Sequence, residues 1–159
     1  MRNLRARDIM QKDVTVVPSD WTVKELATFF VEKAITGAPV TDDAGNLIGV
    51  VSLTDIARYE STRDTEVEIE RPHDYYLRGW EDEIEADELR NFHVDLIKHE
   101  TVKHIMTPMV FKIDAETKVA QIAELMVTGR IHRLVVVEDK IPIGIITTMD
   151  MLNLLRDDN

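Results

Sequence analysis

The feature that most constrains the fold of this chain is an internal duplication. Residues 49–55 contain a glycine, an apolar run, a hydroxyl residue and, three positions later, an aspartate, and residues 144–150 repeat that order. An apolar helical pattern follows each copy. We therefore predict that each copy is a buried strand that runs into a helix. Because a repeated unit determines the architecture of a whole chain, the repeat outweighs every other fold signal.

The duplication extends over most of the chain. The residues that align at an offset of 96 positions are Met10 with Met106, Val14 with Val110, Val17 with Ile113, Val23 with Val119, Ala27 with Ala123 and Val40 with Val136. One residue is lost in the loop before Gly144, so the glycine and the aspartate of the motif align at an offset of 95. Each repeat has about 55 residues, which is marginal for an independent core. The two repeats are therefore expected to bury their apolar faces against each other.

The hydroxyl residue and the aspartate of each copy are expected at the start of a helix: Ser52 with Asp55, and Thr147 with Asp150. A spacing of three residues places both side chains on one side of the first turn. One explanation is a helix N-cap with a supporting carboxylate, which contributes about 1 kcal/mol. The other is a ligand site, because free backbone N–H groups and the helix dipole favour an anion there. The second copy, with its whole surrounding pattern, favours the ligand site.

The remaining pattern predicts the same order in both repeats: strand, helix, strand, strand, helix. In the first repeat the strands are expected over 14–17, ended by Pro18, and over 37–40 and 47–52, with a turn over 42–46 and an apolar helix face over 23–31. In the second repeat the strands are expected over 110–113, 134–137 and 141–147, with a turn over 138–140, a helix from 119 and a final helix to about Arg156. Thr22 and Glu25 form a Thr-x-x-Glu capping box. A short helix is expected over 6–10.

The composition favours a globular, cytoplasmic protein. The chain has 159 residues, of which 44% are hydrophobic, and it has no cysteine, which excludes disulfides, thiolate metal sites and a cysteine nucleophile. No apolar run reaches the roughly 18 residues that a membrane-spanning helix needs. The N-terminus lacks the apolar segment of a signal peptide. A net charge of −11 argues against nucleic-acid binding, because the phosphate backbone would repel the chain.

Residues 61–100 separate the two repeats and carry most of the charge. They hold 13 acidic side chains against five basic ones, a net charge of −8 out of −11. A loop is expected over 61–79, where aliphatic residues are few, and a helix from Trp80 onward. This acidic insert is interpreted as a solvated helix that bridges the repeats or, alternatively, as a surface for dimerisation or for a partner protein. The histidines in or beside it match no zinc-binding spacing and are expected to be exposed: His73, His93, His99 and His104.

The order of the motifs in both halves resembles the CBS domain. The first repeat shows Asp8-Ile9-Met10, then residues 14–18, 22–26, 35–40 and 49–55, and the second shows His104-Ile105-Met106-Thr107-Pro108, then residues 131–136 and 144–150. Two tandem copies resemble a CBS pair, also called a Bateman module. The resemblance implies an α/β (α+β) fold of two β-α-β-β-α repeats packed with pseudo-twofold symmetry. The repeats would be residues 5–60 and 101–156, with the partly helical acidic insert at 61–100.

The resemblance also implies ligand sites. Proteins of this kind often bind adenosine compounds in a cleft of each repeat, where the aspartate accepts hydrogen bonds from both ribose hydroxyls and the hydroxyl residue contacts phosphate. A carboxylate suits a vicinal diol because it only accepts hydrogen bonds. The residues assigned in this way are Ser52 and Asp55 for the first cleft, and Thr147, Asp150, Arg133 and His132 for the second, to which the other repeat would add Val17, Thr22, Ile35 and Thr36.

Arg133 distinguishes the two clefts. The resemblance implies that it meets phosphate, which a guanidinium suits because it donates in a fork. The first repeat has Gly37 at the aligned position and can supply no charge there. The alternative for Arg133 is a salt bridge to the acidic insert. Val135 stands where the family commonly has proline, as Pro39 does in the first repeat, and this is expected to shift the local backbone.

Three functions remain open at this point. The first is a regulatory module, not an enzyme, that senses an adenosine nucleotide (AMP, ADP or ATP) or S-adenosylmethionine. The second is an enzyme, although the sequence has no Ser-His-Asp order, P-loop, glycine-rich dinucleotide motif or defensible metal cluster. The third is an interaction protein with unoccupied clefts that docks a partner through the insert. A homodimer is also expected, with Phe29, Phe30 and Met126 as candidates for leftover apolar helix surface.

Overall fold

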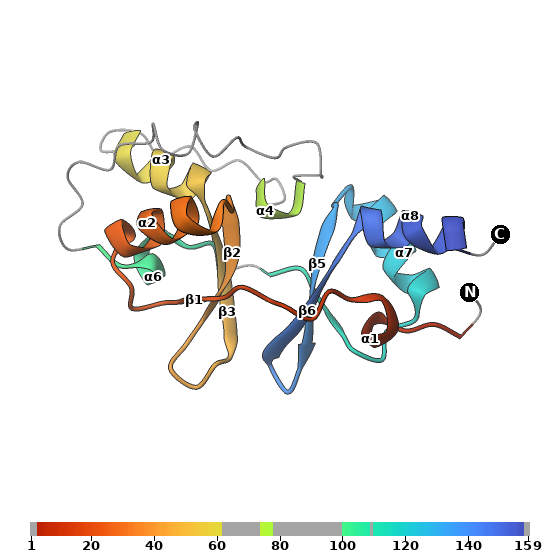
Figure 1. Ribbon diagram of the computed structural model, residues 1–159. Coiled ribbons are helices and arrows are strands. Elements are labelled where there is room, and N and C mark those ends of the chain that lie inside the picture. The colour runs from red at the N-terminus through yellow and green to blue at the C-terminus, as the bar shows by residue number, and fades with distance from the viewer. Residues whose placement is uncertain (1–2, 62–73, 78–99, 109, 158–159) are drawn as a thin grey trace. The chain divides into compact units, whose positions relative to one another are not determined.

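The structure, a computed structural model, groups the chain into two compact units. It describes residues 3–61, 74–77, 100–108 and 110–157. Of these, residues 15–61 and 100–108 form the first-repeat unit, and residues 3–14, 74–77 and 110–157 form the second-repeat unit. Each unit has one three-stranded sheet with helices, so the chain is a mixed α+β protein built from two tandem repeats (Figure 1).

The sheet of the first-repeat unit has the order β1-β2-β3. Its elements are β1 (Val17–Pro18), α2 (Val23–Lys33), β2 (Gly37–Thr41), β3 (Leu47–Ser52), α3 (Leu53–Ser61) and α6 (Val102–Ile105). β1 and β2 pair in parallel, which requires a crossover, and α2 supplies it. β2 and β3 pair antiparallel through a turn in which Gly45 has a φ of 82°.

The sheet of the second-repeat unit has the corresponding order β4-β5-β6. Its elements are β4 (Lys112–Asp114), α7 (Val119–Gly129), β5 (Arg133–Glu138), β6 (Ile141–Thr147) and α8 (Thr148–Asp157). Two short helices from earlier in the chain, α1 (Ala6–Ile9) and α4 (Asp74–Leu77), also belong to this unit. Asp139 and Lys140 connect β5 to β6 with φ values of 49° and 71°, the left-handed backbone that a two-residue hairpin turn needs. The predicted order of strand, helix, strand, strand, helix is therefore confirmed in both repeats.

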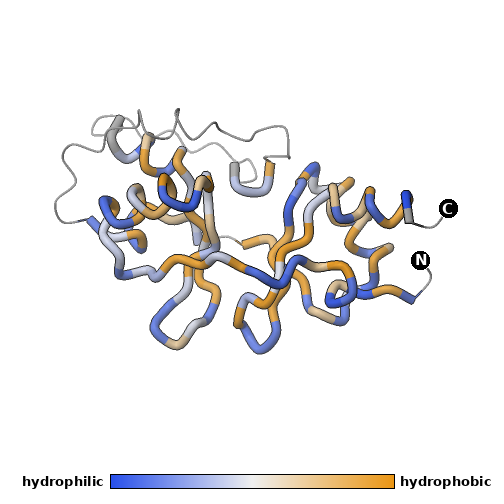
Figure 2. The backbone as a smooth tube through the Cα atoms, in the orientation of Figure 1, coloured by the Kyte–Doolittle hydropathy of each residue, from blue (hydrophilic) through white to orange (hydrophobic). Residues whose placement is uncertain are grey.

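Helix α2 illustrates how the sequence produces these elements. The predicted capping box forms: the backbone N–H of Thr22 donates to Glu25 Oε2 at 2.7 Å, and that of Glu25 donates to Thr22 Oγ1 at 3.2 Å. The helix buries one face, made of Val23, Leu26, Ala27 and Phe30. Fully burying a side chain such as Leu26 or Phe30 contributes about 1.5–3 kcal/mol. Figure 2 shows that the strands are mostly hydrophobic and that hydrophilic residues lie near the hairpin turns.

Each unit includes an N-terminal segment that belongs, in sequence, to the other repeat. Gln11 exchanges two backbone hydrogen bonds with Ile145 of β6, at 2.9 and 3.0 Å. Thr107, the residue aligned with Gln11, exchanges two with Val50 of β3, both at 2.9 Å. The two repeats therefore trade their N-terminal segments.

The glycine that opens each motif copy accommodates the traded segment. A Cβ on Gly144 would lie 2.7 Å from Cγ of Met10, and a Cβ on Gly49 would lie 2.8 Å from Sδ of Met106. These separations are closer than real Cβ contacts allow. The glycines are thus needed because a methionine from the other repeat lies directly over each of them.

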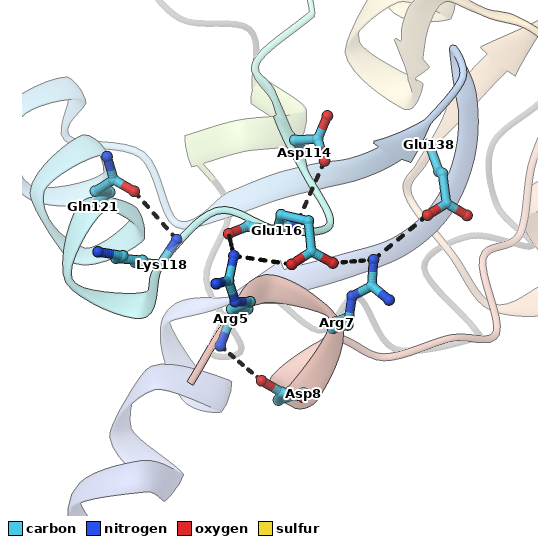
Figure 3. A network of polar contacts seen from close by, with 8 residues as sticks. All are labelled: Arg5, Arg7, Asp8, Asp114, Glu116, Lys118, Gln121 and Glu138. Carbon is cyan, nitrogen blue, oxygen red and sulfur yellow. Dashed lines mark hydrogen bonds and ion pairs between the residues drawn. The ribbon is translucent and has the colours of Figure 1, made fainter. Parts of the chain in front are cut away.

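A set of ion pairs also holds the N-terminal segment on the second-repeat unit. Glu116 lies between Arg5 and Arg7 (Figure 3). Arg5 Nη1 is 2.9 Å from Glu116 Oε2, and Arg7 Nη2 contacts the other carboxylate oxygen. Arg7 Nη2 is also 3.6 Å from Glu138. These side chains are about half exposed, so each pair contributes at most about 1 kcal/mol.

The first strand of each repeat differs from its prediction. Strands were expected over 14–17 and 110–113, but β1 covers Val17–Pro18 and β4 covers Lys112–Asp114. Pro18 was expected to end the strand because proline has no N–H. It lies instead within β1, which is an edge strand, where the missing donor faces away from the ladder.

The predicted apolar surface is wrong for two of its three residues. Phe30 is fully buried and Met126 is 5% exposed, because both lie on the core-facing side of their helices. Phe29 is half-buried and packs edge-to-face on Trp21 at 5.1 Å between ring centroids. The apolar side chains that are exposed on helices of the second-repeat unit are Leu125, Val127, Leu152 and Leu155.

The structure describes only a small part of the acidic insert. The loop expected over 61–79 is wrong at Asp74–Leu77, which form α4 because two aromatic rings there find a buried site. The helix expected from Trp80 onward lies outside the described residues, as do His73, His93 and His99. His104 is exposed as predicted, and its Nδ1 is 2.9 Å from Glu100 Oε2. Within the described ranges, every helix is too short or too polar to cross a bilayer.

Candidate functional site

The motif of the second repeat forms a compact polar corner where β6 meets α8. The backbone N–H and the hydroxyl of Thr147 both donate to Asp150 Oδ2, each at 2.7 Å. The backbone N–H of Asp150 approaches Thr147 Oγ1 at 3.4 Å, which completes a reciprocal cap. The Thr147–Asp150 pair therefore does form the predicted helix N-cap. Because Thr147 gives its one hydroxyl proton to Asp150, it would have to reorient to donate to a phosphate.

The second oxygen of the Asp150 carboxylate faces a residue from the N-terminal segment. Gln11 Nε2 donates to Asp150 Oδ1 at 3.1 Å and lies 3.4 Å from Oδ2. Asp150 is partly exposed. Its Oδ2 is thus fixed by the cap, whereas the partner of Oδ1 among the described residues is an exposed amide that a ligand could replace.

Arg133 reaches the same face of the sheet. It is the first residue of β5 and is paired directly with Thr147, the last residue of β6. Side chains of directly opposed residues in an antiparallel pair stand on one face, with Cβ atoms roughly 4.5–5.5 Å apart. The hairpin register therefore brings the predicted positive charge of Arg133 beside the Thr147–Asp150 corner.

Helix α4 of the insert packs against the start of β5. The backbone N–H of His132 donates to the Tyr76 carbonyl at 2.6 Å, and the backbone N–H of Phe111 donates to Tyr76 Oη at 2.9 Å. Tyr76 also packs edge-to-face on Phe111, at 4.9 Å between ring centroids. These contacts hold α4 on the second-repeat unit.

Tyr75 turns its ring toward Arg133. The guanidinium carbon of Arg133 lies 4.7 Å from the ring centroid, within the range of a cation–π contact. Tyr75 is only 2% exposed. Burial raises the pKa of Tyr75 to about 12, against the opposing effects of the Arg133 charge and a hydrogen bond with Arg133. The phenol therefore stays neutral at ordinary pH. The predicted alternative, a salt bridge from Arg133 to the insert, concerns carboxylates that lie mainly outside the described residues.

Val135 supports this arrangement. Its backbone N–H donates to the carbonyl of Phe111 at 3.2 Å. Pro39, at the aligned position of the first repeat, has no N–H and can make no such bond. The replacement of proline by valine thus adds a hydrogen bond to the segment that holds Tyr76.

The first-repeat unit has the same carboxylate cap but lacks the arginine beside it. The backbone N–H and the hydroxyl of Ser52 donate to Asp55 Oδ2 at 2.7 and 3.2 Å. The residue paired with Ser52 across the hairpin is Gly37, where the second repeat has Arg133. Asp55 is 5% exposed, so its carboxylate is much less accessible than that of Asp150. The two motif copies are similar in geometry but differ in charge and access.

The other predicted ligand residues have local roles in their own units. Val17 is fully buried in the core of the first-repeat unit, and Ile35 packs against that core. Thr22 caps α2, and the carbonyl of Thr36 accepts from the backbone N–H of Leu53 at 2.9 Å. His132 is exposed, and its carbonyl accepts from Thr148 at 3.1 Å in the same way. Their contacts with a ligand stay predictions.

Gln11, Tyr75 and Tyr76 contribute to the site but were not predicted from the sequence. Gln11 carried one usable signal, because it aligns with Thr107 next to the matched methionines. Tyr75 and Tyr76 form an aromatic pair in an acidic segment with few other hydrophobic residues, which hinted at a buried contact. No three His, Asp or Glu side chains within the described ranges form a metal-binding group.

Comparisons with known proteins identify the family of the chain. The family model "CBS domain" matches residues 6–62 and 102–157. An uncharacterised protein of Methanocaldococcus jannaschii, MJ1232, is 29% identical over 154 residues, which cover 96% of this chain. The chain spans only 40% of the length of that relative.

Solved structures show the same fold. The CBS domain of a CBS domain-containing membrane protein from Sphaerobacter thermophilus has a TM-score of 0.64 and 29% identity, over 96% of this chain and 88% of the other. The CBS domain pair of protein MJ0100, in complex with 5′-methylthioadenosine and S-adenosyl-L-methionine, has a TM-score of 0.63 and 20% identity, over 98% of each chain. The family model covers most of this chain in two copies. The chain therefore belongs to the CBS domain family and carries two tandem CBS repeats.

Proposed function

We propose that this chain is a regulatory module that binds an adenosine nucleotide, with AMP as the simplest candidate, at the second-repeat unit. Asp150 would accept hydrogen bonds from the ribose hydroxyls, and Arg133 would bind the phosphate. The observation that carries the proposal is the direct pairing of Arg133 with Thr147, which puts a cation beside the Thr147–Asp150 corner. A nucleotide offers the matching groups, a diol that donates and a phosphate that accepts.

The family supports binding and not catalysis as the activity. The CBS pair of MJ0100 was solved with two adenosyl compounds, so a pair of this fold can accommodate such ligands. S-adenosylmethionine is therefore the second ligand to be tested. It carries no phosphate and would use Asp150 without Arg133. An interaction module that docks a partner through the acidic insert is the alternative function.

The Asp150 carboxylate provides the first test. Asp150→Asn keeps an acceptor for the Thr147 N–H but removes the charge that holds the diol. We expect it to weaken the binding of both adenosine and AMP about ten- to a hundredfold, because hydrogen bonds to a charged group contribute roughly 1.5–3 kcal/mol. The matched control, Asp55→Asn in the first repeat, should cost much less. Titration calorimetry on the parent and both variants measures the difference.

Arg133 provides the second test. Arg133→Gln should weaken AMP about tenfold or more and leave adenosine nearly unchanged, because only AMP has a phosphate to lose. Strong binding that survives Asp150→Asn but not Asp55→Asn would place the ligand in the first repeat. If the parent binds neither AMP, adenosine nor S-adenosylmethionine, the adenosyl proposal fails and the interaction module takes its place.

A further inference from the structure

The contact between Tyr75 and Arg133 joins the acidic insert to the candidate phosphate site. Tyr75 belongs to the insert in sequence, yet its ring is buried in the second-repeat unit, edge-to-face with Tyr76 at 5.2 Å. Tyr76 is in turn fixed by Phe111 and by the backbone of His132, the residue before Arg133. The ring of Tyr75 is therefore a rigid platform beside the first residue of β5.

A guanidinium that lies over an aromatic ring can be held in place while most of its N–H donors stay available for a ligand. The guanidinium carbon of Arg133 lies 4.7 Å from the centroid of the Tyr75 ring, and the guanidinium carries five N–H donors within its own plane. A phosphate binds such a guanidinium at its edge, in a bidentate fork. Tyr75 can thus restrict the Arg133 side chain to one orientation and still leave edge donors for an anion.

Fixing the side chain in advance favours binding. Arginine loses much rotamer freedom when it is ordered, and a ligand that finds it already ordered does not bear that cost. The neutrality of Tyr75 also matters. A carboxylate in its place would neutralise Arg133 and compete with an anionic ligand, whereas a neutral phenol leaves the guanidinium its full charge and takes at most one of its five N–H donors.

We propose that Tyr75 of the acidic insert is a positioning residue for anion binding, which orients the Arg133 guanidinium toward the phosphate of the ligand. The proposal rests on the proposed function for the ligand's identity, but the platform itself would serve any phosphate-bearing ligand. The described part of the insert thereby contributes an aromatic ring to the site. The first repeat, with Gly37 at the aligned position, can have no such arrangement.

The test reduces the partial negative charge on the face of the aromatic ring at position 75 and keeps the shape of the ring. Tyr75→Phe retains the ring, and substitution of position 75 by di- and trifluorinated phenylalanines withdraws charge from the ring face at nearly constant volume. The AMP affinity should fall progressively along this series, to about tenfold weaker at its end, while the adenosine affinity stays constant. Tyr75→Leu, which removes the ring, should act like the last member. Thermal unfolding identifies any variant that has lost its fold.

Two readouts separate this inference from the proposed function. Titration calorimetry gives the ratio of AMP to adenosine affinity, and a ratio that stays flat or rises as the ring loses charge would overturn the positioning role. NMR of the Arg133 Nε–H group during titration with inorganic phosphate needs no adenosyl ligand. A phosphate response that weakens along the series, in a protein that binds no adenosine compound, would support Tyr75 and refute the proposed function. A parent that responds to neither AMP nor phosphate would refute both.

Discussion

At the scale of single residues, the two oxygens of Asp150 differ in their main partners, although Gln11 also lies 3.4 Å from Oδ2. Oδ2 is bound by the backbone and hydroxyl of Thr147, and Oδ1 by the exposed amide of Gln11. A ribose diol that binds Oδ1 must displace this amide. Under the proposed function, Gln11 would therefore compete with the ligand for Asp150 and lower its affinity.

This competition predicts the effect of removing the amide. Gln11→Ala should strengthen adenosine binding by up to about tenfold, because the displaced bond to a charged group contributes at most about 1.5 kcal/mol at an exposed position. Thr107→Ala, at the aligned position of the other segment, is the control and should have no effect. Calorimetric titration with adenosine measures both. Weaker binding by the Gln11 variant would mean that the amide contacts the ligand directly.

The residues that could be predicted from the sequence are those whose geometry is local. Thr147 and Asp150 are three positions apart at a helix start, so their spacing alone fixes the cap. The pairing of Arg133 with Thr147 does not follow from the two-residue turn at Asp139 and Lys140 alone, because that turn would place Ile146 opposite Arg133. A bulge between Val136 and Val137 shifts the register by one residue, and the sequence does not mark it. Gln11 and Tyr75 could not be placed, because each reaches the site from a distant part of the chain through contacts that only the folded unit defines.

At the scale of elements, the exchange of N-terminal segments gives the two glycines unequal surroundings. A Cβ on Gly144 would meet only side-chain atoms of Met10 among its three nearest neighbours. A Cβ on Gly49 would meet the carbonyl oxygen of Thr107 at 2.8 Å as well as Met106. That carbonyl accepts from Val50 and cannot move without breaking the exchanged pair.

This difference predicts unequal destabilisation by the same substitution. Gly49→Ala should lower the free energy of unfolding by about 1–3 kcal/mol, the usual cost of overpacking, and Gly144→Ala by less. Met10→Ala should partly rescue Gly144→Ala, because it removes Sδ and Cγ and leaves only the Met10 Cβ at 2.9 Å. Met106→Ala should not rescue Gly49→Ala, because the backbone obstacle stays. Chemical denaturation of the four single and two double variants gives the coupling energies, and equal rescue in both repeats would contradict this assignment.

The element boundaries that the sequence missed have a physical cause. The helices and hairpins were predicted closely because caps, turn residues and periodicity are encoded within each segment. β1 and β4 are short edge strands whose limits depend on pairing with β2 and β5, and their own residues do not mark those limits. Helix α4 formed where a loop was expected because Tyr75 and Tyr76 are stabilised by burial and not by helix propensity.

At the scale of the whole molecule, the prediction of a homodimer can be related to the apolar side chains that the described helices leave exposed. Leu125 and Val127 on α7 are 47% and 79% exposed, and Leu152 and Leu155 on α8 are 53% and 58% exposed. Helices α7 and α8 pack against each other within the second-repeat unit. Leu152 and Leu155 are three positions apart and so lie on one side of α8, and exposed apolar side chains that share a helix face can belong to an interaction surface. The homodimer stays a prediction, and its candidate contact residues become these four exposed side chains of α7 and α8 in place of the buried Phe30 and Met126.

The reassignment predicts which substitutions prevent dimerisation. Leu152→Lys combined with Leu155→Lys should leave a folded monomer, because two charges cannot be buried in an apolar interface without a large desolvation cost. Ile141→Lys, at an apolar side chain that is 38% exposed at the start of β6, is the control and should stay dimeric. Light scattering at micromolar concentration, with and without AMP, measures the mass. A parent that is monomeric under both conditions would refute the dimer, and a double variant that stays dimeric would show that the copies meet through another surface.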